Sequence, residues 1–162
     1  MREVLDKSYK FKVISNTRLG RACVAIKKIL KGEIICKMAG PNISLKEFSE
    51  KYDINGCTPL QIGEDIFIDL IEPYVCFNHS CDPNAGLRNN AVLFALKDIK
   101  VGEEIFYDYS TSVDDVWWTM ECKCRTKKCR KLIGDFQSVP HLQKEFYRKN
   151  KALTKYIHTI YY

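Results

Sequence analysis

One twelve-residue pattern occurs twice in this sequence, and it limits the possible folds more than any other feature. The segment VAIKKILKGEII (residues 24–35) aligns with FALKDIKVGEEI (residues 94–105), and six positions carry the same residue in both. Each copy predicts a strand, a turn at Gly32 or Gly102 that needs a positive φ angle, and a second strand. Two copies are too few for a solenoid. We therefore expect two similar β units packed into one fold of several small sheets.

The rest of the first half adds more short strands and one helix. In YKFKV (residues 9–13) apolar side chains alternate with lysines, which predicts a half-buried strand. The segment LQIGEDIFIDL (residues 60–70) predicts two short strands around Gly63. Ser44 and Glu47 have the spacing of a capping box at the start of a helix. The fold class predicted from these patterns is mainly β, of a β-rich α+β type.

Composition and charge exclude several classes of protein. The 162 residues are 46% hydrophobic, which is enough for a real core, and the net charge of +6 is spread over the chain. No apolar run is long enough to cross a membrane, and the first residues do not resemble a secretory signal. Eight cysteines in such a chain indicate a reducing compartment, where cysteines bind metals more often than they form disulfides. We expect an intracellular protein, in the cytoplasm or the nucleus.

Three cysteines have the spacing of metal ligands. Cys122, Cys124 and Cys129 form the motif C-x-C-x4-C, and their thiolates could share one tetrahedral zinc at about 2.3 Å. A disulfide across the single residue between Cys122 and Cys124 would be strained. The neighbouring lysines and arginines favour thiolates over thiols. The alternative is three unrelated surface cysteines.

A tetrahedral zinc needs a fourth ligand, either water or a distant residue. Cys81 is the strongest candidate, because it lies in the polar, proline-containing segment FNHSCDPNAG (residues 77–86) and so on a shaped loop. The other cysteines lie among apolar residues and are expected to act as small core side chains. They are Cys23, Cys36, Cys57 and Cys76.

The order of three motifs resembles a known family. FNHSCDPN, then GEEIFYDY, then C-x-C-x4-C is similar to the SET-domain protein-lysine methyltransferases that carry a post-SET zinc segment, over roughly residues 10–135. The resemblance implies a SET fold of several small sheets with a knot-like threaded segment, which is an exception to the usual rule against threading. It also implies a SET domain over 1–110, a post-SET loop and zinc segment over 111–136, and a C-terminal helical extension over 137–162.

The C-terminal extension also has a helix signal of its own. SVPHLQKEFYRKN begins with a serine in a capping position, Ser138, followed by a proline in the first turn. Leu142 and Phe146 have helical spacing and are expected to form its apolar face.

The resemblance implies roles for single residues. Asn78 and His79 would contact S-adenosylmethionine largely through backbone groups, and Leu132 would pack on its adenine. Tyr109 would be the essential tyrosine, which also lies at the cofactor, and Tyr107 would control how many methyl groups are added. One structural zinc would bind four cysteines: Cys81, Cys122, Cys124 and Cys129.

The family's glycine-x-glycine cofactor motif differs here, because it reads Gly20-Arg21-Ala22. Alanine keeps the backbone N–H and a small side chain, so Arg21 and Ala22 are still expected to bind the cofactor unless the third position needs a positive φ angle. Trp117 and Trp118 lie in the loop that borders the lysine channel in the family.

Methyl transfer from a sulfonium to an amine needs a neutral amine and an in-line approach. A free lysine with a pKa of about 10.4 is only ~0.04% neutral at pH 7, so a narrow apolar channel that lowers this pKa favours the reaction. Tyr107 and Tyr109 share one face of a predicted strand and suit such a channel. Asp108 points the other way and is expected to be a hydrogen-bonded or surface carboxylate. The hydroxyl of Tyr107 favours monomethyl-lysine as the main product.

Three functions remain in competition. The first is an S-adenosylmethionine-dependent methyltransferase acting on a lysine of a histone tail or another basic protein. The second is a catalytically weak, SET-like zinc module that binds peptides or protein partners. The third is a nucleic-acid-binding zinc protein, motivated by KCRTKKCRK, but direct nucleic-acid binding is disfavoured because no reading helix or stacking platform adjoins the cluster.

Overall fold

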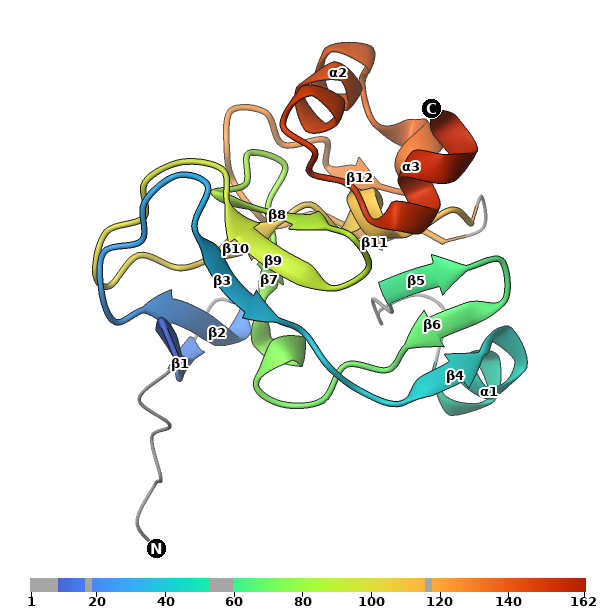
Figure 1. Cartoon of the computed structure of the whole chain (residues 1–162), viewed down its shortest axis with the longest axis horizontal. Helices are drawn as coiled ribbons and strands as arrows, with labels where there is room; N and C mark the ends of the chain where they lie inside the picture. Colours follow the sequence, from blue (N-terminus) through green and yellow to red (C-terminus); the bar gives the residue numbers. More distant parts are fainter. Residues whose placement is uncertain (1–8, 17–18, 53–59, 116–117) are drawn as a thin grey trace, which may run out of the picture.

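The computed structural model describes residues 9–16, 19–52, 60–115 and 118–162, and it consists mostly of short strands (Figure 1). The strands are β1 (Phe11–Asn16), β2 (Gly20–Ala25), β3 (Ile34–Lys37), β4 (Asn42–Ser44), β5 (Leu60–Gly63), β6 (Ile66–Ile68), β7 (Asn78–His79), β8 (Ala85–Arg88), β9 (Val92–Ala95), β10 (Phe106–Tyr107), β11 (Met120–Glu121) and β12 (Leu132–Ile133). The helices are α1 (Leu45–Lys51), α2 (His141–Lys149) and α3 (Lys155–Tyr161), with single 3-10 turns η1 (Tyr74–Cys76), η2 (Tyr109–Ser112) and η3 (Phe136–Ser138). Among these residues no helix is long and apolar enough to span a bilayer.

Within the described residues, the strands form several small sheets rather than one large one. Two are three-stranded, with the orders β3-β9-β8 and β4-β6-β5, and three are two-stranded, pairing β1 with β2, β7 with β10 and β11 with β12. The β7–β10 pair is parallel, whereas the other pairs are antiparallel. The predicted fold class, a β-rich fold of small sheets with a C-terminal helical region, is therefore confirmed.

The two copies of the repeated pattern face each other across an approximate two-fold axis. Ile29 and Ile99 exchange both backbone hydrogen bonds, each at 2.9 Å. The turn glycines have matching positive φ angles, +85° at Gly32 and +81° at Gly102, as predicted. Equivalent bonds flank the centre: Ala25 N–H to Glu103 O, Ala95 N–H to Glu33 O, Gly102 N–H to Ala25 O and Gly32 N–H to Ala95 O. The repeat is thus a pair of similar β units packed against one another.

The predicted N-terminus of α1 is also present. The Ser44 hydroxyl accepts a hydrogen bond from the Glu47 N–H, and the Glu47 carboxylate accepts one from the Ser44 N–H, which completes the capping box. Phe48 is the buried residue of this helix and stacks on Phe67 of β6.

The C-terminal helices pack on the sheet that holds β9. A second hydrophobic cluster joins Phe94 and Leu96 to Phe136, Tyr147 and Ile157, from η3, α2 and α3. In Figure 1 these helices lie together at one end of the molecule, beside β8 and the β11–β12 pair.

The predicted start and apolar face of α2 are wrong. Pro140, not Ser138, precedes the first helical residue, and Ser138 instead ends the turn η3, where its hydroxyl donates to Asp135 O at 2.7 Å. Leu142 is 84% exposed and Phe146 is also exposed, whereas Tyr147 is buried. The helix is rotated so that Tyr147 faces the core, because this side chain fills the space beside Phe94 and Phe136.

Candidate functional site

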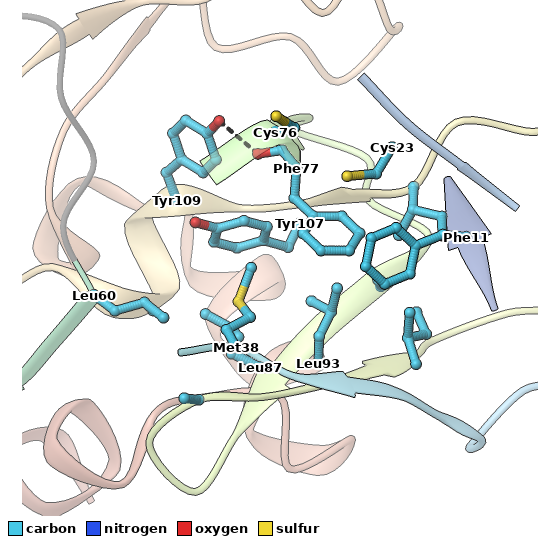
Figure 2. Close-up of a cluster of buried hydrophobic side chains, with 14 of the residues drawn as sticks. Phe11, Cys23, Met38, Leu60, Cys76, Phe77, Leu87, Leu93, Tyr107 and Tyr109 are labelled. Atoms are coloured by element: carbon cyan, nitrogen blue, oxygen red, sulfur yellow. Dashed lines mark hydrogen bonds between the residues drawn. The ribbon is translucent and has the colours of Figure 1, made fainter. Parts of the chain in front are cut away.

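The two predicted catalytic tyrosines lie side by side in the main hydrophobic core. Tyr107 ends β10 and Tyr109 begins η2, so they do not share one strand as expected, because Asp108 caps the 3-10 turn that follows the strand. Their ring centroids are nevertheless 4.9 Å apart, and the side chains are only 2% and 8% exposed. Figure 2 shows the Tyr109 hydroxyl pointing at the Phe77 carbonyl, to which it donates a hydrogen bond of 2.8 Å.

The parallel pairing of β7 with β10 places Asn78 and His79 beside these tyrosines. Tyr107 is the register partner of His79, and Phe106 is the partner of Asn78. The Asn78 side chain donates to Arg21 O at 2.9 Å and to the Glu104 carboxylate at 2.8 Å. The structure therefore brings Arg21 and Asn78, two of the predicted cofactor residues, into direct contact.

His79 connects the tyrosine pair to the cysteines. Its Nδ1 accepts the Tyr109 N–H at 3.2 Å, and its Nε2 lies 3.2 Å from Cys81 Sγ. Burial lowers the pKa of His79 to about 4, with Asp108 raising it and Arg130 lowering it further, so the ring is neutral at neutral pH. Because Nδ1 is an acceptor, the proton is on Nε2, which donates to Cys81 Sγ.

The four predicted ligand cysteines come together. Cys81 follows β7, and Cys122, Cys124 and Cys129 lie between β11 and β12, yet all four sulfurs are within 4.8 Å of one another. The sulfurs of Cys81 and Cys122 are 3.6 Å apart, close to the edge of about 3.8 Å that a tetrahedron with zinc–sulfur bonds of ~2.3 Å requires. All seven described cysteines are free thiols, and Cys57 lies outside the described residues. The donor set and its spacing fit a tetrahedral zinc.

The thiols of this cluster differ in acidity. Burial raises the pKa of Cys81 and Cys122. Burial also acts to raise the pKa of Cys124, but the Thr126 hydroxyl, 3.3 Å from its sulfur, and nearby backbone N–H groups lower it to about 6. Cys124 is therefore more ready than Cys81 or Cys122 to lose its proton to an incoming metal.

The remaining predicted cofactor residues lie on the β1–β2 and β11–β12 pairs. Gly20 has φ +83°, whereas Ala22 does not have a positive φ angle and is fully buried opposite Ile14. Alanine is thus compatible with the backbone at the third position of the motif. Leu132 is 62% exposed on β12, which leaves its side chain free of the core.

Of the two tryptophans expected in the loop that borders the lysine channel, the structure describes one. Trp118 is buried in the main core, and its backbone N–H donates to Asp115 O at 3.0 Å. Trp117 lies outside the described residues.

Sequence reasoning missed two parts of the site. Asn84 binds β10 as a neighbouring strand would, since its amide donates to Glu104 O at 2.7 Å and accepts the Phe106 N–H at 2.8 Å. Asp108, expected to be a hydrogen-bonded or surface carboxylate, is buried and hydrogen-bonded; the partner missed is Arg130, whose Nη2 donates to it at 2.6 Å. The signal for Asp108 was its position between two core tyrosines, where an acidic side chain needs a partner.

The family model of the SET domain matches residues 20–110, which is more than half of the chain. Among curated relatives, the probable histone-lysine N-methyltransferase set-23 of Caenorhabditis briggsae is 30% identical over 145 residues, covering 76% of this chain and 60% of that protein. The variant-silencing SET domain-containing protein of Plasmodium falciparum is 31% identical over 150 residues, covering 79% of this chain and 6% of that protein. The chain thus spans 60% or less of the length of these relatives.

Among solved structures, the methyltransferase domain of human histone-lysine N-methyltransferase SETMAR matches with a TM-score of 0.61 at 23% sequence identity. The match covers 78% of this chain and 58% of that chain, and it shows that the two share a fold.

Proposed function

This chain belongs to the SET-domain family, and we propose that it is a methyltransferase that uses S-adenosylmethionine to methylate the ε-amine of a protein lysine. The observation that carries the proposal is the buried Tyr107–Tyr109 pair beside β7, with the Tyr109 hydroxyl fixed on Phe77 O. Tyr109 belongs to GEEIFYDY and Phe77 to FNHSC, so this hydrogen bond joins the two segments that carry the resemblance.

The chemistry asks three things of the protein residues. They must bind the cofactor, keep the lysine amine neutral and align it with the methyl group. For cofactor binding we propose Arg21, Ala22, Asn78, His79 and Leu132, with Tyr109 at the methyl end of the cofactor. S-adenosylmethionine supplies an electrophilic methyl group on a sulfonium.

The protein must also keep the lysine amine neutral and aligned. The aromatic rings exclude water, which lowers the pKa of an amine placed among them. Their faces also attract the cation that forms on transfer. Alignment then provides most of the rate enhancement, in the sense of proximity and orientation.

We propose that Tyr107 limits the number of methyl groups transferred. Its hydroxyl can hold a water or the amine, and it occupies space that a methylated amine would need in order to turn into the attack geometry. Monomethyl-lysine is then the main product.

The four cysteines are proposed to hold one structural zinc that fixes the segment between β11 and β12. The proposed units are a SET domain over 1–110, a post-SET loop and zinc segment over 111–136, and a C-terminal helical extension over 137–162. The substrate is proposed to be a histone tail or another basic protein, because related proteins are named histone-lysine N-methyltransferases. Reduced thiolate ligands also fit the cytoplasm or the nucleus.

The proposal is tested with purified protein, labelled S-adenosylmethionine and two matched peptides, one with lysine and one with arginine at the candidate position. The expected result is label on the lysine peptide alone. Calorimetry with S-adenosylmethionine separates the competing zinc module, whose cofactor site would be weakened at Ala22. Absence of measurable cofactor binding by the folded, zinc-loaded protein would contradict the enzyme and favour a binding module.

A further inference from the structure

A buried carboxylate joins three segments that are far apart in the sequence. Asp108, 1% exposed between the two tyrosines, accepts hydrogen bonds from Arg130 Nη2 at 2.6 Å, Tyr147 Oη at 2.8 Å and the Ser110 N–H at 3.1 Å. Its Oδ1 also lies 3.5 Å from His79 Nδ1. A buried carboxylate is stable only when donors replace the water that it loses, so each donor matters.

Arg130, together with Gln143 of α2, holds the loop of Cys81 from two sides. Arg130 donates to Cys81 Sγ through its backbone N–H and its Nε, each at 3.4 Å. On the other side, Gln143 Nε2 donates to Cys81 O at 2.8 Å and lies 2.7 Å from Tyr147 Oη. Gln143 and Tyr147 are four residues apart on α2 and therefore share one face of that helix.

These contacts run from the C-terminal extension to the candidate catalytic residues. Cys81 follows the β7 segment that carries Asn78 and His79, and Asp108 lies between Tyr107 and Tyr109. A shift of either anchor moves a group that touches substrate or cofactor in the proposed reaction.

We propose that helix α2 acts as a positioning element, in which Gln143 and Tyr147 hold the Cys81 loop and the Asp108 carboxylate in register for metal binding and catalysis. The catalytic part of this inference rests on the proposed function, whereas the part that concerns the cysteine cluster does not. The C-terminal extension then helps to position the residues of the cysteine cluster and of the candidate catalytic site.

The test compares Tyr147→Phe and Gln143→Leu with the wild-type protein. Tyr147→Phe keeps the ring and its packing but removes one donor to Asp108, and Gln143→Leu keeps most of the volume but removes the donor to Cys81 O. Leu142→Ala is the matched control, because Leu142 is next to Gln143 on the same helix and 84% exposed.

The first measurement is zinc release from the loaded protein to a coloured chelator. Each variant should release zinc about fivefold faster than wild type, which corresponds to the loss of one net hydrogen bond, and Leu142→Ala should match wild type. The second measurement is of steady-state kinetics, with KM and kcat determined separately. In both variants KM for S-adenosylmethionine should rise and kcat should fall.

The two measurements separate the two claims. Faster zinc release in a protein that shows no methyl transfer would support the positioning of the Cys81 loop while removing the proposed function. A lower melting temperature with unchanged zinc release and unchanged KM would overturn the inference, because Gln143 and Tyr147 would then only stabilise the fold. If Gln143→Leu fails to fold, Tyr147→Phe decides by the same criteria.

Discussion

The two turn glycines of the repeated unit offer a matched pair of substitutions. Gly32 and Gly102 have φ angles of +85° and +81°, and a methyl group added at either would meet no atom within 4 Å. Gly32→Ala and Gly102→Ala therefore change backbone strain without a clash. A residue with a Cβ in this left-handed backbone conformation destabilises the folded state by about 1–2 kcal/mol. The same substitution stabilises the folded state by roughly 0.4–1 kcal/mol, because alanine reduces the conformational entropy of the unfolded chain.

The net expectation is a loss of about 1 kcal/mol of unfolding free energy for each variant. Because the two sites are equivalent across the approximate two-fold axis, the losses should be equal, and the double variant should lose about 2 kcal/mol if the sites are independent. Urea unfolding, monitored by circular dichroism, measures these losses of unfolding free energy. An unchanged m-value shows that the substitution changed stability alone.

Gly63→Ala is the control for this experiment. Gly63 does not have a positive φ angle, and an added methyl group would meet Ile66 at an ordinary 3.6 Å. The unfolding free energy of Gly63→Ala should rise by roughly 0.4–1 kcal/mol, because only the restriction of the unfolded chain applies there. Equal stability of wild type and both turn variants, or a large difference between Gly32→Ala and Gly102→Ala, would refute the account of the repeat.

Three further predictions concern the site and the helix cap. Cys81→Ser should lower the zinc content below one per chain by elemental analysis, and full occupancy would remove Cys81 from the ligand set. Tyr107→Phe should shift products towards di- and trimethyl-lysine with little change in the first transfer, and an unchanged product distribution by mass spectrometry would exclude its proposed role. Ser44→Ala should reduce the unfolding free energy by about 1 kcal/mol in urea, because it removes the capping box of α1; no change would show that this cap adds nothing to stability.

Local patterns predicted those parts of the fold that depend on neighbours in the sequence. The glycine turn within each copy of the repeat, the capping box and the C-x-C-x4-C spacing are all features of a few neighbouring residues, and the structure has all three. The repeat predicted that two similar units pack into one fold. It did not predict that Ile29 pairs with Ile99, because the sequence does not give the axis that relates the two units.

The Asp108 network could not be predicted in the same way. Arg130 and Tyr147 reach Asp108 across 22 and 39 residues, and neither has a motif that marks it as a partner. The apolar face of α2 was wrong for a related reason. Leu142 and Phe146 have the right spacing for a buried face, but Tyr147 brings both an aromatic ring for the core and a hydroxyl for Asp108.

Intact-mass analysis of one lysine peptide tests the central claim most directly. The peptide is incubated with S-adenosylmethionine and wild-type protein, with Tyr109→Phe, or with Tyr162→Phe, a control at an exposed tyrosine of the C-terminus. The account predicts mainly a single added methyl group with wild type and with Tyr162→Phe. It predicts loss of most product with Tyr109→Phe while that variant stays folded and retains its zinc. Undiminished methylation by Tyr109→Phe would contradict the account.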